Sequence, residues 1–218
     1  MIPKKLHQVW LGGNDIPKEF VKFTNNWREL HPDWEYKLWT EETILDKPQI
    51  RNLVDKCEEF SSKSNVVRLY AVYLEGGVYA DMDIDWLRNF DELLNVSSFG
   101  SVETNETNDT LGLKLSEFDI NYSKKFCNAV FGAVAESEWV DWQIKRLSEM
   151  VSQEPPWGPT LMTDAVEVFK NTDHFYEYPS IYFYPYHWSE KNRKSEDFRD
   201  NKESFAVHYW ESSWDHKK

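Results

Sequence analysis

Apolar side chains recur along the chain at two spacings, and each spacing predicts a different kind of element. Short apolar runs predict strands, and apolar residues three and four positions apart predict amphipathic helices. The runs that fit strands cover residues 2–11, 34–38, 78–84, 99–102, 126–135, 181–186 and 205–210. The helical pattern appears in a central helix, which we expect Ser61 or Ser62 to cap, and in residues 17–30, 49–60, 136–151 and 160–169. A chain of 218 residues with this pattern is long enough for one domain with a sizeable core.

The stretch from Ser64 to Asp85 combines a helix, a glycine stop and an apolar strand that ends in carboxylates. Gly76 and Gly77 can take the positive φ angle that ends a helix. Residues 78–84 then alternate, so we expect a strand in which Asp81, Asp83 and Asp85 share one face.

Carboxylates gathered on one face repel one another unless a cation neutralises them. Their hard oxygen ligands favour Mg²⁺ or Mn²⁺ over softer metals. Such ions keep coordination positions open for phosphate, which predicts a diphosphate-bearing substrate. A solvated acidic turn at a strand end is the alternative, because an Asp-x-Asp pattern is short.

Composition narrows the classes of function. The net charge of −13 argues against non-specific binding to nucleic acid or anionic lipid. Aromatic residues make up 16% of the chain and include 11 Trp, which fits either core packing or stacking on sugars and bases. Cys57 and Cys127 are too few for a disulfide framework or a zinc cluster. The sequence shows neither a signal peptide nor a membrane-spanning run, so we expect a cytoplasmic protein that could lie at the inner face of the membrane.

Three separated blocks resemble the DXD sugar transferases of glycosyltransferase family 32. The blocks are Ile2–Gly12, with its Ile-Pro-Lys-x-x-His-Gln-x-Trp-x-Gly opening, Ser64–Asp83 and Val207–Trp214. The family includes yeast-type initiating mannosyltransferases, bacterial capsular polysaccharide transferases and, more distantly, the glucosyltransferase domains of clostridial toxins. The resemblance implies a single α/β domain of GT-A type over residues 1–218, with a Rossmann-like nucleotide-binding sheet flanked by helices.

The resemblance also implies a reaction. It predicts metal-dependent, retaining transfer of a sugar from a UDP- or GDP-sugar to a hydroxyl of a glycan, lipid-linked or protein acceptor, as in polysaccharide biosynthesis. The predicted catalytic residues are Asp83, Arg68 and Asn65. The predicted metal ligands, for Mn²⁺ or Mg²⁺, are Asp81, Asp83 and His208. The predicted donor-binding residues are Trp10, which would stack on the nucleobase, and Ser64, Asn65, Arg68, Tyr79, Asp81, Ser213 and Trp214.

Several of these residues are also explained by ordinary structural roles. Trp10 fits core packing, Arg68 fits a surface ion pair, and a lone His208 after a short apolar run is more often structural than a ligand. His7 lies in the middle of the first predicted strand, and we expect it to be a satisfied structural histidine. An Asp-x-Asp phosphotransferase is disfavoured, because such enzymes have a small Thr-type residue at the position that Asp85 occupies here.

Asn65 departs from the family pattern, which usually has Asp after the Ser. Its side chain can still accept a hydrogen bond, but it adds a donor and removes a charge. A changed donor preference, a weakened enzyme and a deliberate inactivating substitution all fit this difference. The alternative function is therefore a nucleotide-sugar binding protein of the same fold that has lost catalysis.

Overall fold

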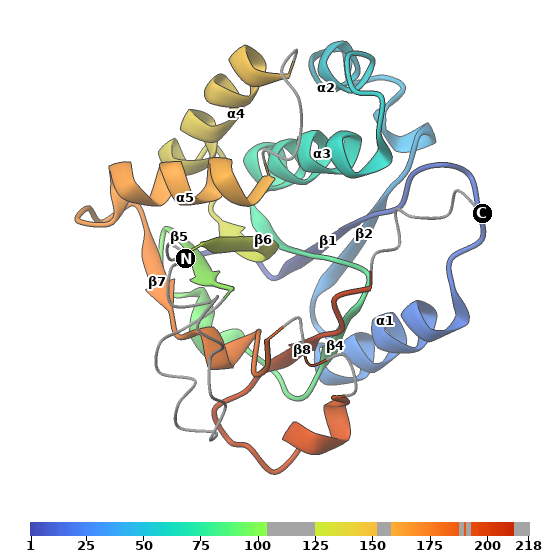
Figure 1. The fold of residues 1–218 in the computed structure, drawn as a ribbon, viewed down its shortest axis with the longest axis vertical. Coiled ribbons are helices and arrows are strands. Elements are labelled where there is room, and N and C mark those ends of the chain that lie inside the picture. Colours follow the sequence, from blue (N-terminus) through green and yellow to red (C-terminus); the bar gives the residue numbers. More distant parts are fainter. Residues whose placement is uncertain (104–124, 152–157, 188–189, 191–192, 212–218) are drawn as a thin grey trace.

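A mixed six-stranded sheet forms the centre of the computed structural model, which describes residues 1–103, 125–151, 158–187, 190 and 193–211 (Figure 1). The strand order is β2-β1-β3-β6-β5-β7. β1 runs parallel to β2 and β3, β5 runs parallel to β7, and β6 is antiparallel to β3 and β5. The strands are β1 (Lys5–Val9), β2 (Glu35–Trp39), β3 (Gly77–Ala80), β5 (Ser98–Val102), β6 (Phe126–Ala133) and β7 (Tyr176–Tyr178).

Helices cover both faces of this sheet. Four of them lie on one face: α2 (Pro48–Val54), α3 (Phe60–Glu75), α4 (Glu138–Met150) and α5 (Gly158–Phe169) (Figure 1). The other face carries α1 (Lys18–Leu30) and a small antiparallel sheet of β4 (Ile84–Trp86) and β8 (Ala206–His208). This arrangement confirms the predicted α/β fold with a sheet flanked by helices. The single-domain boundary of 1–218 stays a prediction.

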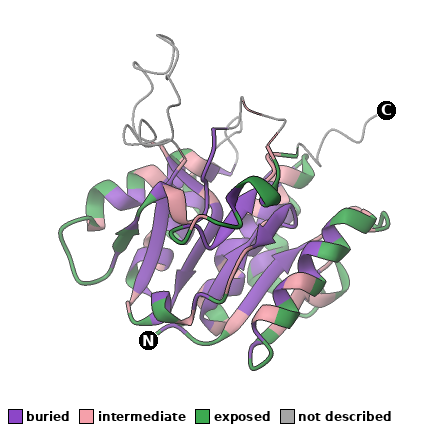
Figure 2. Cartoon of the chain, turned by 90° about the horizontal axis from the view of Figure 1, so that it is seen from below, coloured by how far each residue is buried: buried purple, intermediate pink, exposed green. Residues whose placement is uncertain are grey.

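Alternation along the strands produces two apolar cores, one on each face. Tyr79 of β3 packs with the core under α3, α4 and α5, whereas its neighbours Val78 and Ala80 pack with the opposite core. The inner strands β1, β3, β5 and β6 are mostly buried, whereas the edge strands β2 and β7, the outer sides of helices and the turns are more exposed (Figure 2). No helix among the described residues is long and apolar enough to cross a membrane.

The step from α3 to β3 requires glycine at both positions. Gly76 has φ 62° and Gly77 has φ 111°, in the region that L side chains rarely adopt. A Cβ at Gly77 would lie 2.6 Å from the Lys5 carbonyl oxygen, and one at Gly76 would lie 2.8 Å from the Ala135 nitrogen. The predicted glycine stop is confirmed, and it sends the chain directly from α3 into the centre of the sheet.

The strand predicted over residues 78–84 is wrong in one respect. β3 ends at Ala80, residues 81–83 form a turn, and β4 then leaves the main sheet to pair with β8. The Asp81 amide still bonds to the Ala129 carbonyl of β6, and the Ile84 amide bonds back to Asp81, which closes the turn. Because the alternation is interrupted, Asp85 does not join the face of Asp81 and Asp83.

Three further predictions about elements are corrected. The helix expected over residues 49–60 is α2 alone, because tight turns at Lys56 and Cys57 end it after Val54. α3 begins at Phe60 with Glu59 at its N-cap, so Ser61 and Ser62 lie inside the helix and do not cap it. The strand expected over residues 181–186 is a 3-10 helix at Ser180–Tyr182, after Pro179, and the strand of this region is β7.

Candidate metal and donor site

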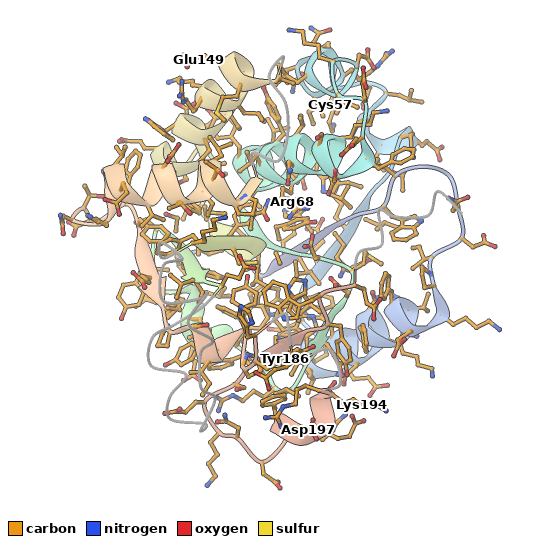
Figure 3. The ribbon with its side chains drawn as sticks, in the orientation of Figure 1. Cys57, Arg68, Glu149, Tyr186, Lys194 and Asp197 are labelled. Atoms are coloured by element: carbon orange, nitrogen blue, oxygen red, sulfur yellow. The ribbon has the colours of Figure 1, made fainter. Side chains whose placement is uncertain are left out.

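Arg68 is the most enclosed charge of the candidate site. It extends from the side of α3 that faces the sheet (Figure 3) and is 3% exposed. Its guanidinium donates to the Asn128 carbonyl oxygen at 2.7 Å and to Ser64 Oγ at 3.1 Å, and it lies 4.5 Å from the centre of the Tyr79 ring. Burial opposes the charge, but Asp81 at 3.2 Å compensates and keeps the pKa of Arg68 above its usual value. Arg68 is therefore a fixed cation inside the molecule, and the surface ion pair considered above is excluded.

Asp81 is held from the side of α3 and β3. Its Oδ1 accepts a hydrogen bond from the Tyr79 hydroxyl at 2.5 Å and pairs with Arg68. Burial raises the pKa of Asp81, Arg68 opposes that effect, and the nearby Asp83 carboxylate adds to it. Burial also raises the pKa of Tyr79 well above its usual value, so its hydroxyl stays a donor. One oxygen of Asp81 is thus engaged, while no hydrogen bond from a described residue reaches its Oδ2.

Asp83 is held from the opposite side, by the C-terminal segment. Its Oδ2 accepts from the Glu211 amide at 2.8 Å and lies 3.3 Å from His208 Nε2. Burial opposes protonation of His208, but the adjacent Asp83 outweighs it and holds the pKa of His208 well above its usual value. β8 therefore brings a residue 125 positions away from Asp83 into direct contact with it.

One ligand atom from each of Asp81, Asp83 and His208 lies within 4.8 Å of the other two. Two carboxylate oxygens and one imidazole nitrogen form a donor set that suits Mn²⁺ and also accepts Mg²⁺. The charge also fits, because burial and the neighbouring Asp83 carboxylate both disfavour the charge on Asp81, and a bound cation would offset both effects. The residues present therefore fit a divalent cation.

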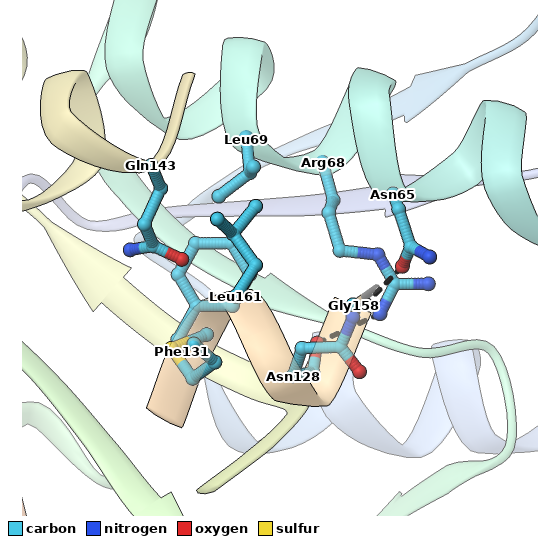
Figure 4. Close-up of a pocket in the computed structure, with 9 residues that line it drawn as sticks. Asn65, Arg68, Leu69, Asn128, Phe131, Gln143, Gly158 and Leu161 are labelled. Carbon is cyan, nitrogen blue, oxygen red and sulfur yellow. Dashed lines mark hydrogen bonds between the residues drawn. The ribbon is translucent and has the colours of Figure 1, made fainter. Parts of the chain in front are cut away.

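Asn65 faces a partner that sequence reasoning missed. Its Oδ1 accepts from Asn128 Nδ2 at 2.8 Å, across the gap between α3 and β6 (Figure 4). Gly158, at the start of α5, closes over this amide pair: a Cβ there would lie 2.4 Å from Asn128 Nδ2 and 2.8 Å from Asn65 Oδ1. The pair borders a small pocket that Leu161 and Met162 also line. Asn128 gave one signal in the sequence, since it is a polar residue inside the apolar run of β6.

Trp10 lies at the carboxyl end of β1, beside the aromatic side chains of α1. It is partly exposed, its ring meets Phe20 edge-on at 6.2 Å, and its Nε1 donates to the Asn14 carbonyl oxygen at 2.7 Å. Ser64 is fully buried and accepts from Arg68, so it supports Arg68 in this structure. Ser213 and Trp214 lie outside the described residues. The donor-binding roles of these residues stay predictions.

His7 has the structural role that was predicted for it. Its Nδ1 accepts from Trp39 Nε1 at 3.0 Å, which leaves Nε2 to donate to the Gly76 carbonyl oxygen at 2.8 Å. Burial lowers the pKa of His7 to about 4, so the ring is neutral. It lies at the junction of β1, β2 and the glycine stop, and it helps to hold the end of α3.

Part of the chain is similar in sequence to known proteins. The family profile described as "Glycosyltransferase sugar-binding region containing DXD motif" matches residues 17–100, a segment that includes Arg68, Asp81 and Asp83. Inositol phosphoceramide mannosyltransferase 3 of Schizosaccharomyces pombe is 36% identical over 99 residues, which are 43% of this chain and 28% of that protein. The match thus spans less than a third of this curated relative.

Solved structures share the fold at low sequence identity. The PaToxG glycosyltransferase has a TM-score of 0.57 at 15% identity and covers 77% of this chain and 69% of its own. A glycosyltransferase involved in glycosylation of the major capsid of PBCV-1 has a TM-score of 0.51 at 9% identity and covers 96% of this chain and 95% of its own. These likenesses show the fold, which is the predicted GT-A type. Residues 17–100 of this chain are therefore similar to the DXD-containing sugar-binding regions of glycosyltransferases, within a chain that has the GT-A fold.

Proposed function

We propose that this chain is a glycosyltransferase that uses a divalent cation to transfer a sugar from a nucleotide-sugar to an acceptor hydroxyl. The observation that supports this most strongly is the grouping of Asp81, Asp83 and His208 within 4.8 Å. Buried Arg68 stands beside this group and is paired with Asp81. Residues from three separate parts of the chain converge on one small volume, which a surface acidic turn would not require.

The chemistry follows from the charge that develops during transfer. As the glycosidic bond breaks, the leaving nucleoside diphosphate gains negative charge. A bound Mn²⁺ or Mg²⁺, held by Asp81, Asp83 and His208, would neutralise that charge. Arg68 supplies a second fixed positive charge close by, already oriented by Ser64 and the Asn128 carbonyl. Because these partners hold Arg68 in place before a donor binds, little reorganisation is needed during the reaction.

The donor would lie across the carboxyl ends of β1 and β3, where open α/β sheets bind ligands. Trp10 at the end of β1 would stack on the nucleobase, and Asp81 at the end of β3 would face the diphosphate. Asn65 and Arg68 would then face the sugar, at the mouth of the pocket that Gly158 and Asn128 line. The family resemblance implies retention of anomeric configuration, and front-face attack by the acceptor would give that outcome without a covalent nucleophile.

The choice of donor is guided by the relative that bears a mannosyltransferase name. We propose a hexosyl nucleotide as donor, with GDP-mannose as the first probe and UDP-glucose as the second. The acceptor remains a prediction: a hydroxyl of a glycan, a lipid-linked sugar or a protein.

The second candidate is a nucleotide-sugar binding protein of the same fold, and the Asn65–Asn128 pair favours it. Asn65 Oδ1 already accepts from Asn128, so the side chain presents an N–H group where a carboxylate would present an acceptor. A ligand hydroxyl that needs an acceptor at this position would then bind less well.

The test is calorimetric titration with GDP-mannose and UDP-glucose, with and without MnCl₂, followed by product analysis. We expect Mn²⁺-dependent binding of one donor and slow transfer or hydrolysis. The Asn65→Asp variant separates the two candidates, because faster turnover with unchanged metal dependence would identify a weakened transferase. Donor binding without turnover in either form would favour the binding protein, and no nucleotide binding in either form would contradict both.

A further inference from the structure

Asp85 is the carboxylate of the acidic motif that the candidate metal site does not use. It is 6% exposed and forms no ion pair with a described residue, so hydrogen bonds alone satisfy its charge. Asn26 of α1 donates to Oδ1 at 2.8 Å, and Ser195 donates from its hydroxyl to Oδ2 at 2.5 Å. A buried carboxylate without a cation is costly unless such donors hold it in place. Asp85 therefore ties β4 to α1 on one side and to the segment around Ser195 on the other.

The hydrogen bonds continue from Ser195 to Tyr209 with a defined direction. A carboxylate can only accept, so the Ser195 hydroxyl proton is committed to Asp85. The Tyr209 hydroxyl, 2.6 Å from Ser195 Oγ, must then be the donor of that pair. The same Tyr209 oxygen accepts from the Ser195 amide at 3.0 Å. Each hydrogen bond in this network from Asp85 to Tyr209 therefore has one possible direction, which makes the arrangement specific.

Tyr209 follows His208 directly and is fixed at both ends of its side chain. Its ring stacks on Phe23 of α1, with centroids 4.9 Å apart and an interplanar angle of 24°, while its hydroxyl is held by Ser195. Its amide donates to the Asp83 carbonyl oxygen at 3.1 Å. The side chain thus anchors the end of β8 immediately beside the candidate metal ligands.

The chain then makes a strained turn that returns to Asp83. Trp210 has φ 56°, in the left-handed region, which is unfavourable for a residue other than glycine. The turn lets the Glu211 amide reach Asp83 Oδ2 at 2.8 Å. Such strain persists only where surrounding contacts hold the chain in place, and the contacts of Tyr209 do this on the preceding residue.

We propose that Asp85, Ser195 and Tyr209 form a positioning network that holds strand β8 and keeps His208 and the Glu211 amide against Asp83. None of these three residues is a ligand in the site proposed above; they act through β8. The part of this inference that concerns metal affinity rests on the proposed function, and the part that concerns strand β8 does not.

The test compares Tyr209→Phe and Asp85→Asn with the matched variant Tyr178→Phe. Tyr209→Phe keeps the ring on Phe23 and removes only the hydroxyl. Asp85→Asn puts an amide that can donate where Ser195 needs an acceptor, and it provides a second variant if Tyr209→Phe folds poorly. Tyr178→Phe also removes a buried hydroxyl, one that donates to the Leu93 carbonyl oxygen at the far edge of the main sheet. Hydrogen exchange of the intact, metal-free protein is followed in the peptic peptide that covers residues 205–211. The Mn²⁺ affinity of the protein is then measured by titration.

We expect exchange in residues 205–211 to be about tenfold faster in both network variants and close to wild type in Tyr178→Phe. We expect Mn²⁺ affinity to fall about 3- to 10-fold in the network variants, because outer partners of metal ligands contribute on this scale or more. Tyr178→Phe should lower the melting temperature about as much as Tyr209→Phe does, because each change removes one buried hydroxyl, and it should leave Mn²⁺ affinity within about twofold.

Unchanged exchange in the network variants would overturn the inference, whatever the metal data show. Faster exchange with unchanged Mn²⁺ affinity would overturn the positioning role and leave only a structural one. A wild-type chain that binds no Mn²⁺ contradicts the proposed function instead, and hydrogen exchange alone then decides whether the network holds β8 against Asp83.

Discussion

Two buried histidines on strands of this molecule have opposite electrostatic surroundings. His7 lies between the Trp39 indole and the Gly76 carbonyl, both uncharged, and burial lowers its pKa to about 4. His208 is also buried, yet it faces the Asp83 carboxylate, which raises its pKa well above the usual value against the effect of burial. Burial alone therefore does not distinguish a structural histidine from a candidate ligand, whereas the charge of the partner does.

The difference follows from what each strand joins. β1 lies between β2 and β3 in the main sheet, and the hydrogen-bond partners of His7 there are the Gly76 carbonyl and the Trp39 indole. β8 pairs with β4 outside that sheet, so His208 lies opposite Ile84 and next to the turn of residues 81–83. The turn at residues 81–83, which interrupts the predicted strand, lets Asp83 reach His208 of β8. The candidate metal site thus lies where the chain leaves the regular sheet.

The largest effect is expected from Asp83→Ala, which removes the partner that distinguishes His208 from His7. Transfer should fall more than about a thousandfold, because the loss of this ligand also removes the bound cation that would neutralise the diphosphate. Metal-enhanced nucleotide binding should disappear in the same variant. Turnover assays and calorimetry with GDP-mannose and UDP-glucose measure both. Metal-dependent turnover that survives this change would break the comparison.

The structural side of the comparison is tested by pH. Between pH 6.5 and about pH 4 the unfolded chain protonates His7 and the folded chain does not, so stability falls as the pH falls through this window. The shift from 6.5 to about 4 corresponds to about 3 kcal/mol. Urea unfolding of wild type and His7→Gln across the window isolates this contribution, since the other titrating groups cancel in the difference. An equal pH dependence in both proteins would show that His7 accepts a proton in the folded state.

Much of the fold could be predicted from periodicity, because its determinants are local. The glycine stop at Gly76 and Gly77 and the helices around it follow from side chains within a few residues of one another. The turn at residues 81–83 could not be predicted in this way. Alternation continues through Asp81 and Asp83 in the sequence, and only the pairing of β4 with β8 shows that the chain has left the sheet.

The candidate site shows the same division. Arg68, Asp81 and Asp83 share one continuous motif and could be named from it, and the match of residues 17–100 covers that motif. Asn128, Ser195 and Tyr209 carry no motif, because their roles arise from contacts with residues far away in the chain. His208 stands between these cases: its strand pattern favoured a structural role, and only the resemblance indicated that it could be a metal ligand.

His208→Ala should have a smaller effect than Asp83→Ala, because two carboxylates remain. We expect Mn²⁺ affinity to fall about 10- to 100-fold, measured by calorimetry at pH 7.5. His7→Gln serves as the control, and it should leave Mn²⁺ affinity within about twofold although it changes a buried histidine. If both variants weakened Mn²⁺ binding equally, the two histidines would differ in surroundings but not in role.

The smallest effect is expected from Cys127→Ala, which tests whether Asp83 or Cys127 raises the pKa of His208 more. Both Asp83 and the Cys127 thiol raise the pKa of His208, with the Asp83 charge as the larger cause. Histidine ring titration by NMR in the metal-free protein should therefore show a clear fall in the pKa of His208 in Asp83→Asn and a lesser fall in Cys127→Ala. A fall in Cys127→Ala as large as that in Asp83→Asn would make the thiol the main partner of the ring. In that case His208 would resemble His7, as a histidine held by its core neighbours, and its assignment as a ligand beside Asp83 would lose its electrostatic basis.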